Sequence, residues 1–498
     1  MLVRDIKRTA LFVAPLFVLL LITYSLWDPE TTEQIQSHVD SFLGKAPPSD
    51  DVAPPKESAP APSFGITTPF PPDSPPEEPP AAPPSAAPLP PPASNPDSPA
   101  SGTIPSGTNI FLPEADPSAG THREIFDVYT PDRKFFPITF ANYSVFNPNI
   151  IPHPTLDDTY IIVGQKSQDT VNDPEATFYE IACNAKFTDG TLKCVNDEAI
   201  ILPISPTTGD TSKCTGEIEL LNMNKGPHDA RVFYGLKKPY ITFGSNSMFA
   251  CFGQWMQDFR TLVDWGVDMV QNDNFVSPVD LQRPEPWSAV EKNWFVFWDK
   301  DNQMYAHYDS TPSRSFAPLY DNGTAGPNLG PFAAEQDEKC LAHYLPKLPE
   351  TNESIHQATN SLRITTCNRA DKDCKATDAN TVIITIIQHK TWYDWHGEYE
   401  PYVVAFRERS PFEVHAISEK PLWIYGRERI DEKKAELLYV VSLNWKDRGR
   451  KYHGFLDDDI FLAFGIEDKK AGGMTVKAAD LLKGMGLCSD VPLLALAP

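Results

Sequence analysis

Residues 295–309 read FVFWDKDNQMYAHYD, two apolar, aromatic-rich runs separated by the polar stretch DKDNQ. Short runs of this kind on either side of turn-forming residues are typical of a β-hairpin. The same outline returns in VFYGLKKPYITFG (232–244), VVAFRERSPFEVHAI (403–417) and GFLDDDIFLAFGIED (454–468). Hairpins repeated over such a length predict an all-β fold and suit a β-propeller better than a single sandwich.

The remaining apolar runs agree with this interpretation. They are short and rich in Val, Ile and Phe, as in TYIIVGQ (159–165) and TVIITIIQH (381–389). Amphipathic helices are few, and the best candidate is VKAADLLKGM (476–485). Strands without alternating helices argue against a parallel α/β fold.

The N-terminus has a different composition. Residues 10–27, ALFVAPLFVLLLITYSLW, carry no formal charge, and Arg4, Lys7 and Arg8 precede them. Their length nearly matches a bilayer core, so we expect a signal anchor over 10–27, a cytosolic tail over 1–9 and a lumenal remainder. A cleaved signal peptide is the alternative, but its apolar region is usually shorter.

A proline-rich segment follows the predicted anchor. Between Pro47 and Pro117 lie 24 of the 50 prolines. Such a composition cannot bury a core, so residues 28–121 are interpreted as a disordered stalk and 122–498 as the globular head. A ligand for proline-binding domains is the alternative.

Two features of the head fit an oxidising lumen. All eight cysteines lie after residue 180, and their even number suggests disulfides, among them a short loop closed by Cys367 and Cys374. Three N-x-S/T sequons begin at Asn142, Asn322 and Asn352. The formal charge of −24 argues against nucleic acid as a partner. We therefore predict a Golgi or ER membrane protein with one membrane helix.

Residues 224–233, NKGPHDARVF, place His228, Asp229 and Arg231 before an apolar run. Gly-Pro followed by polar residues is also an ordinary turn composition, so a charged turn entering a buried strand remains an open alternative.

Three segments together resemble the mannoside phosphorylases of glycoside hydrolase family 130. FNPNIIPHPTLDDTYIIVGQ (146–165) resembles the opening blade of their propeller, and KYHGFLDDDIFLAFGIED (451–468) resembles the last. GPHDARVF resembles the Gly-x-Glu-Asp-Pro-Arg motif that carries the catalytic aspartate, although His228 replaces Glu and Ala230 replaces Pro. With an anchor and a lumenal head, the chain also resembles fungal β-1,2-mannosyltransferases, which implies a five-bladed propeller.

The resemblance assigns the catalytic acid or base to Asp229. We expect a dry pocket to raise the pKa of Asp229 toward the working pH, whereas a close pair with Arg231 would lower it. Arg231 would contact a donor phosphate or hold Asp229, and His228 would face the substrate. We expect transfer of mannose from GDP-mannose to a glycan with inversion, and no divalent metal. The alternatives are a lumenal hydrolase or phosphorylase on the same propeller and an inactive glycan-binding propeller.

Further candidates lie in two segments. In the last blade, Asp468 matches a terminal active-site Asp that would orient sugar hydroxyls, and His453 is a second possible pocket residue; a loop acid and a structural histidine are the alternatives. In MFACFGQWMQDFRTLVDW (248–265), Asp258 and Arg260 are candidate sugar contacts. The aromatic residues Trp255, Phe259 and Trp265 would stack on sugars, or else belong to the core. LDDDI (456–460) matches an Asp-x-Asp metal motif, but we favour a hairpin turn with exposed acids.

Overall fold

The computed structural model describes residues 120–168, 177–264, 273–349, 352–393, 396–431 and 434–491. The predicted cytosolic tail, the predicted anchor over 10–27 and almost all of the predicted stalk lie outside these ranges, so those predictions stay predictions. Within the described residues, no helix combines the length and apolar character needed to cross a membrane.

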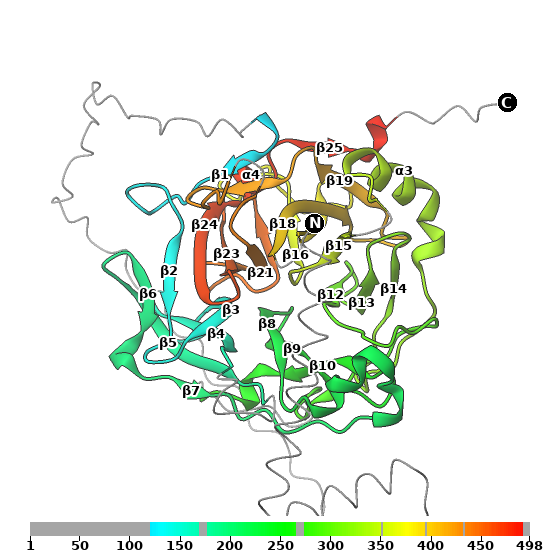
Figure 1. The fold of residues 1–498 in the computed structure, drawn as a ribbon. Helices are drawn as coiled ribbons and strands as arrows, with labels where there is room; N and C mark the ends of the chain where they lie inside the picture. The colour runs from blue at the N-terminus through cyan, green and yellow to red at the C-terminus, as the bar shows by residue number, and fades with distance from the viewer. Residues whose placement is uncertain are drawn as a thin grey trace, which may run out of the picture. The chain divides into compact units, whose positions relative to one another are not determined.

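Strands are the main regular structure of the described residues (Figure 1). We divide them into five groups of antiparallel neighbours, of which the first and fifth belong to one nine-stranded sheet. The first group consists of β3 (Val145–Pro152), β4 (Tyr160–Lys166), β5 (Glu180–Thr188) and β6 (Thr191–Cys194). The second consists of β8 (His228–Tyr234), β9 (Pro239–Asn246), β10 (Phe252–Asp258) and β11 (Val279–Asp280). The third consists of β12 (Phe295–Trp298), β13 (Met304–Asp309) and β14 (Ser315–Pro318).

The fourth group contains β15 (Glu353–Gln357), β16 (Leu362–Thr365), β17 (Thr381–Tyr393), β18 (His396–Arg407) and β19 (Val414–Ser418). The fifth contains β21 (Leu438–Trp445), β23 (Asp459–Ile466) and β24 (Lys470–Lys477). The early strand β2 (Phe136–Thr139) pairs with β24 and also with β6, so it joins the last group to the first. β2 thereby joins the first and last groups into one nine-stranded sheet, and the predicted all-β, propeller-like fold is confirmed.

The outermost elements complete the groups. β7 (Ile200–Ile201) pairs with β5, β25 (Met485–Leu487) pairs with β19, and β1 (Arg123–Ile125) pairs with β20 (Leu422–Ile424). The longest described helix is α3 (Ala334–Tyr344), which the sequence pattern did not predict. The helix predicted over 476–485 shortens to α4 (Ala478–Leu481), because Lys470–Lys477 already forms β24 against β23.

Three of the four predicted hairpins form as paired strands, namely β8–β9, β12–β13 and β18–β19. The fourth, over 454–468, is wrong. Its first strand, β22 (His453–Phe455), pairs in parallel with β16, whereas β23 pairs with β21 and β24. Residues 456–458 therefore connect two groups and do not close a hairpin.

Aliphatic side chains fill the space between neighbouring groups. Ile384 of β17 packs in one cluster with Leu443 of β21 and Leu462 of β23. Ile161 of β4 and Val232 of β8 share another. Strands buried on both faces have continuous apolar sequences, which explains runs such as TVIITIIQ. The strands β3, β8 and β21 contact one another near the centre of the molecule (Figure 1).

The covalent cross-links agree with an oxidising environment. All eight cysteines are paired, as Cys183–Cys194, Cys214–Cys251, Cys340–Cys488 and Cys367–Cys374. The predicted short loop at Cys367–Cys374 is confirmed. The side chains of the three sequon residues Asn142, Asn322 and Asn352 are exposed.

Candidate active site

Two irregular strands bring Asn147 and Asp229 together near the centre. The pairing of β3 with β4 shifts between Phe146 and Asn149, and that of β8 with β9 shifts between His228 and Arg231. Within these bulges, Asn147 and Asp229 adopt left-handed backbone conformations, with φ of 50° and 49°. Bulges redirect side chains and are common beside active sites. Here the Nδ2 of Asn147 donates to the Oδ1 of Asp229 over 2.9 Å.

A pair of side chains from the first group fixes the backbone of Asp229. Gln165 on β4 and Glu180 on β5 face each other in register. The Oε1 of Gln165 accepts the amide of Asp229 over 2.8 Å, and the Oε1 of Glu180 accepts the amide of Ala230 over 3.1 Å. A left-handed conformation is costly for a residue other than glycine, so it persists only where neighbours determine it. These two consecutive amide contacts provide that constraint.

The contact with Ala230 also accounts for one departure from the family motif. A proline has no amide hydrogen and could not donate to Glu180. Ala230 supplies the donor and is itself 1% exposed. The replacement of Pro by Ala is therefore matched by a buried acceptor on β5.

Arg231 holds the site together from the other side. Its Nε donates to the carbonyl of Ala358 over 3.0 Å, and its Nη1 donates to the carbonyl of Asp229. Its Nη2 reaches the Oδ1 of Asn293 over 3.1 Å and the hydroxyl of Tyr439 over 3.3 Å. The guanidinium therefore binds the backbone of Asp229 and leaves the carboxylate free of a direct ion pair with it.

The expectation of a raised pKa for Asp229 is wrong. Burial raises this pKa, but the charges of Arg231 and Lys292 and the hydrogen bond from Asn147 outweigh burial and hold it below its usual value. The carboxylate is consequently ionised at neutral pH. In that state it can accept a proton and serves poorly as a proton donor.

His228 lies beside Asp229 as a neutral ring. It packs on Phe178 at a centroid distance of 3.5 Å and edge-on to Phe252 at 5.1 Å. Burial lowers the pKa of His228 to about 4, and Lys292 adds to this effect against the opposing charge of Asp229. The ring lines the same small pocket as Asp229 and Lys292.

The C-terminal segment approaches the same point. A Cβ placed on Gly465 of β23 would lie 2.2 Å from the Oδ1 of Asn147, so the close approach requires glycine. Beyond β23, Asp468 occupies an exposed turn with φ of 48°. Desolvation by the surrounding chain, then the charge of Asp229, raises the pKa of Asp468. The three segments behind the sequence resemblance thus converge through Asn147, Asp229 and Gly465.

Two lysines lie near each other at the pocket that contains Asp229. Lys292 is exposed and lines the pocket, and Lys390 on β17 is half-buried. Burial and the charge of Lys292 lower the pKa of Lys390, which shows that the two ammonium groups repel each other. Burial and both lysines lower the pKa of His356 to about 4. An anion placed here would relieve this repulsion.

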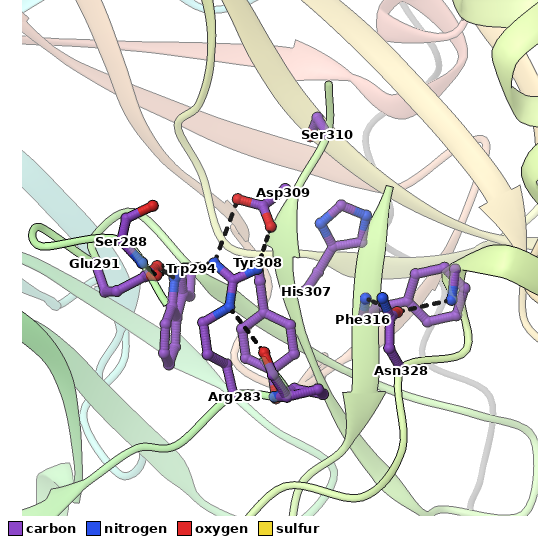
Figure 2. A network of polar contacts seen from close by, with 12 residues as sticks. Arg283, Ser288, Glu291, Trp294, His307, Tyr308, Asp309, Ser310, Phe316 and Asn328 are labelled. Carbon is purple, nitrogen blue, oxygen red and sulfur yellow. Dashed lines mark hydrogen bonds and ion pairs between the residues drawn. The ribbon is translucent and has the colours of Figure 1, made fainter. Parts of the chain in front are cut away.

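A buried ion-pair network supports the wall that carries Lys292 (Figure 2). Glu291, the preceding residue, accepts from Arg283 over 2.9 Å, from the amide of Ser288 over 2.6 Å and from the Nε1 of Trp294 over 3.2 Å. Arg283 is also paired with Asp309. Because buried charges need such partners, the backbone on either side of Lys292 is firmly held.

The predicted sugar contacts Asp258 and Arg260 lie at the other end of their group. Asp258 is opposite Tyr240 on β9, whereas His228 is opposite Gly244, four residues or about 13 Å along the strand. Asp258 is fully buried and is paired with Lys238 over 2.8 Å and with Arg260 over 2.7 Å. The structure therefore gives this pair a packing role and does not bring it to Asp229.

The aromatic residues of the same segment belong mainly to the core. Trp255 and Phe259 are 9% and 0% exposed and pack in one apolar cluster. The Nε1 of Trp255 donates to the carbonyl of Asn246 over 3.0 Å. Trp265 lies outside the described residues.

His453 and the acidic run 456–460 also lie away from Asp229. The Nε2 of His453 is 2.8 Å from the hydroxyl of Thr365, at the far end of β16 from Ala358. Asp457 accepts the amides of Arg369 and Ala370, and Asp458 is paired with Arg369 over 2.6 Å. The acids thus form a turn bound to basic and amide groups, but this turn closes no hairpin and the acids are half-buried, so the favoured interpretation is wrong in those two respects.

Sequence reasoning missed most of the groups around Asp229 and Arg231. They are Asn147, Gln165 and Glu180 beside Asp229 and Ala230, Asn293 and Tyr439 on Arg231, Lys292 in the pocket, and Lys390 near Lys292. A signal existed for two of them, since Gln165 and Glu180 are polar residues at the ends of otherwise apolar strands. Such positions favour polar groups that have a specific partner.

No protein-family model and no curated protein matches the sequence. Similar solved structures are enzymes that act on carbohydrates. The β-1,2-mannobiose phosphorylase of Listeria innocua is 11% identical over 68% of this chain and 91% of its own, with a TM-score of 0.38. MPT-1, a GDP-Man-dependent mannosyltransferase from Leishmania mexicana, is 10% identical over 70% and 90%, with a TM-score of 0.36. A structure of the GH130 family described as containing hydrolases of β-1,2 mannosidic linkages in Candida mannan is 10% identical over 74% and 93%, with a TM-score of 0.35.

Proposed function

We propose that this protein is an inverting β-mannosyltransferase that moves mannose from GDP-mannose to a hydroxyl group of a glycan, on a five-bladed propeller head. The observation that carries the proposal is an ionised Asp229 that shares a pocket with Lys292, with Lys390 close to that lysine. The carboxylate is held by Asn147, and Lys292 shares its pocket. This is an arrangement suited to a base beside an anionic leaving group.

In the proposed reaction, the carboxylate of Asp229 takes the proton of the acceptor hydroxyl. The acceptor oxygen forms a bond to C1 of mannose while the bond from C1 to the phosphate oxygen breaks. The electron pair of that bond leaves with GDP. Attack opposite the leaving group converts the α-linked donor into a β-mannoside. A lowered pKa keeps Asp229 in the form that this step consumes.

The leaving diphosphate would be met by Lys292 and Lys390. Both ammonium groups lie close enough to lower the pKa of His356, and they repel each other when no anion is present. Arg231 has four partners in the protein, so we assign it to orienting Asp229 and its neighbours. In this proposal, the lysines neutralise the charge that a divalent metal neutralises in other transferases.

A hydrolase is the second candidate, because Asp468 is a second carboxyl group whose pKa is raised in part by the charge of Asp229. Inverting hydrolysis needs one carboxyl group to give a proton and another to activate water. Asp229 is ionised and Asp468 has the raised pKa, so in a hydrolase Asp468 would give the proton and Asp229 would activate water. A phosphorylase would need a proton donor in the same way.

We further propose that the head lies in the lumen of the Golgi or ER, attached through the N-terminal apolar segment. The four disulfides and the exposed sequon residues support this proposal, because both modifications belong to the secretory pathway.

The test uses the full chain and its Asp229→Asn variant with GDP-mannose and a mannooligosaccharide acceptor. Asparagine keeps the shape of the side chain and can still accept from Asn147. We expect a new β-mannoside with the natural chain and a loss of about 10²–10⁴-fold with the variant. Undiminished transfer by a folded variant would rule out the role of Asp229. Release of free mannose from a β-mannoside would favour the hydrolase, and glycan binding without turnover would favour an inactive propeller.

A further inference from the structure

A row of aromatic side chains leads from Asp229 to the protein surface. Tyr439 accepts from Arg231, and its ring lies edge-on to Tyr399 at a centroid distance of 4.8 Å. The ammonium of Lys390 lies 5.6 Å from the ring of Tyr399 and 5.0 Å from the ring of Trp392. Each contact joins the next, so the row is continuous from Arg231, which binds the backbone carbonyl of Asp229, to Trp392.

The backbone places the outer members of this row on one face of the long β17–β18 hairpin. Lys390 pairs with Tyr399, and Trp392 pairs with Gly397. Residues two apart on a strand point to the same side, so Lys390 and Trp392 share a face with Tyr399. The hairpin extends this face in register as far as the pair of Tyr393 with His396. The hairpin therefore presents Lys390, Trp392 and Tyr399 together on one face.

Exposure increases along the row. Arg231 is 4% exposed, Tyr399 and Tyr439 are half-buried, and Trp392 is 43% exposed. A Cβ on Gly397 would lie 3.2 Å from the indole ring of Trp392, so glycine allows the ring to lie against the opposite strand. Covering a glycine is one use of an aromatic side chain in a sheet. Covering Gly397 does not explain why the row continues inward to Arg231.

We propose that Trp392 and Tyr399 form a binding site for the acceptor oligosaccharide, in which Trp392 stacks on a sugar ring beyond the one that receives mannose. This inference rests on the proposed function and names the substrate class of the same site as a chain of several neutral sugars. Aromatic rings offer large, rigid surfaces that bury the apolar face of such a ring, and Lys390 between them can donate to sugar hydroxyls.

The proposal predicts an effect that depends on the length of the acceptor. Trp392→Ala should raise the KM for mannotetraose by about two- to tenfold, from the usual strength of aromatic contacts. The KM for mannose as acceptor and the KM for GDP-mannose should stay unchanged. If Trp392 serves only to hold Lys390 or cover Gly397, the variant will instead affect both acceptors equally or raise the KM for GDP-mannose, and the proposal fails. Phe332→Ala is the matched control, since Phe332 is 75% exposed beside α3.

A binding measurement separates this inference from the proposed reaction. The full chain is titrated with mannotetraose by calorimetry, without a donor, for the natural sequence and for Trp392→Ala. Weaker binding by about two- to tenfold in the variant supports the site even if no transfer is found. Equal binding by the two proteins, or no binding by the natural chain, overturns the inference even if Asp229 proves to be a catalytic base.

Discussion

The buried carboxyl group of Glu180, which accepts the amide of Ala230 beside Asp229, allows a quantitative prediction of how the stability of the protein depends on pH. Glu180 is 1% exposed, and burial is the main reason that its pKa rises from 4.5 to about 8. Its Oε1 accepts the amide of Ala230, whereas its Oε2 is buried without a hydrogen-bond partner among the described residues. The folded protein therefore keeps a proton on Glu180 that the unfolded chain releases at neutral pH.

This difference makes stability depend on pH with a definite sign. A carboxyl group whose pKa is raised by folding contributes stability that is complete below its unfolded pKa and is lost as pH rises through its folded pKa. The window here runs from about pH 4.5 to about pH 8. A shift of that size corresponds to at most about 5 kcal/mol of unfolding free energy, since each pKa unit is worth about 1.4 kcal/mol.

Glu180→Gln removes the ionisation and keeps the contact, because an amide oxygen can still accept from Ala230. We expect the variant and the natural chain to be about equally stable at pH 5. At pH 9 the variant should be more stable by several kcal/mol, up to about 5. Urea unfolding followed by tryptophan fluorescence at pH 5, 7 and 9 measures the difference. Glu419→Gln serves as the control, because Glu419 is exposed after β19. A stability difference that is the same at all three pH values would refute the reasoning.

Two further substitutions test the geometry around Asp229. Ala230→Pro removes the amide that Glu180 accepts and should cost about 1–3 kcal/mol in urea unfolding, whereas Ala230→Gly keeps the amide and should cost about 1 kcal/mol or less. Gly465→Ala places a Cβ 2.2 Å from the Oδ1 of Asn147, so it should displace the amide that binds Asp229 and slow transfer by about 10- to 100-fold. Full transfer activity in a folded Gly465→Ala variant would show that Asn147 is dispensable.

Several properties of this chain follow from local sequence alone. Strand-turn-strand rhythm in stretches such as 295–309 predicts the all-β fold, because alternation and turn chemistry act over a few residues. A local pattern also explains why the hairpin predicted over 454–468 is wrong. Its acids form a turn, but the partner of β22 is β16, nearly 90 residues earlier in the chain. Strand pairing at that range depends on the whole fold, which a local pattern does not contain.

The candidate site divides in the same way. The motif around 228–231 indicated Asp229 as a candidate catalytic residue, because both the charged cluster before an apolar run and the family resemblance can be recognised in the sequence. The charge state of Asp229 depends on local and distant groups together, since the neighbouring Arg231 outweighs burial with the help of Lys292 and Asn147, which come from distant segments. Asp258 and Arg260, only 30 residues from Asp229, lie at the opposite end of the same strand group. The sequence determines which chemical groups are available to react. Their pKa values and neighbours depend on contacts that only the folded chain makes.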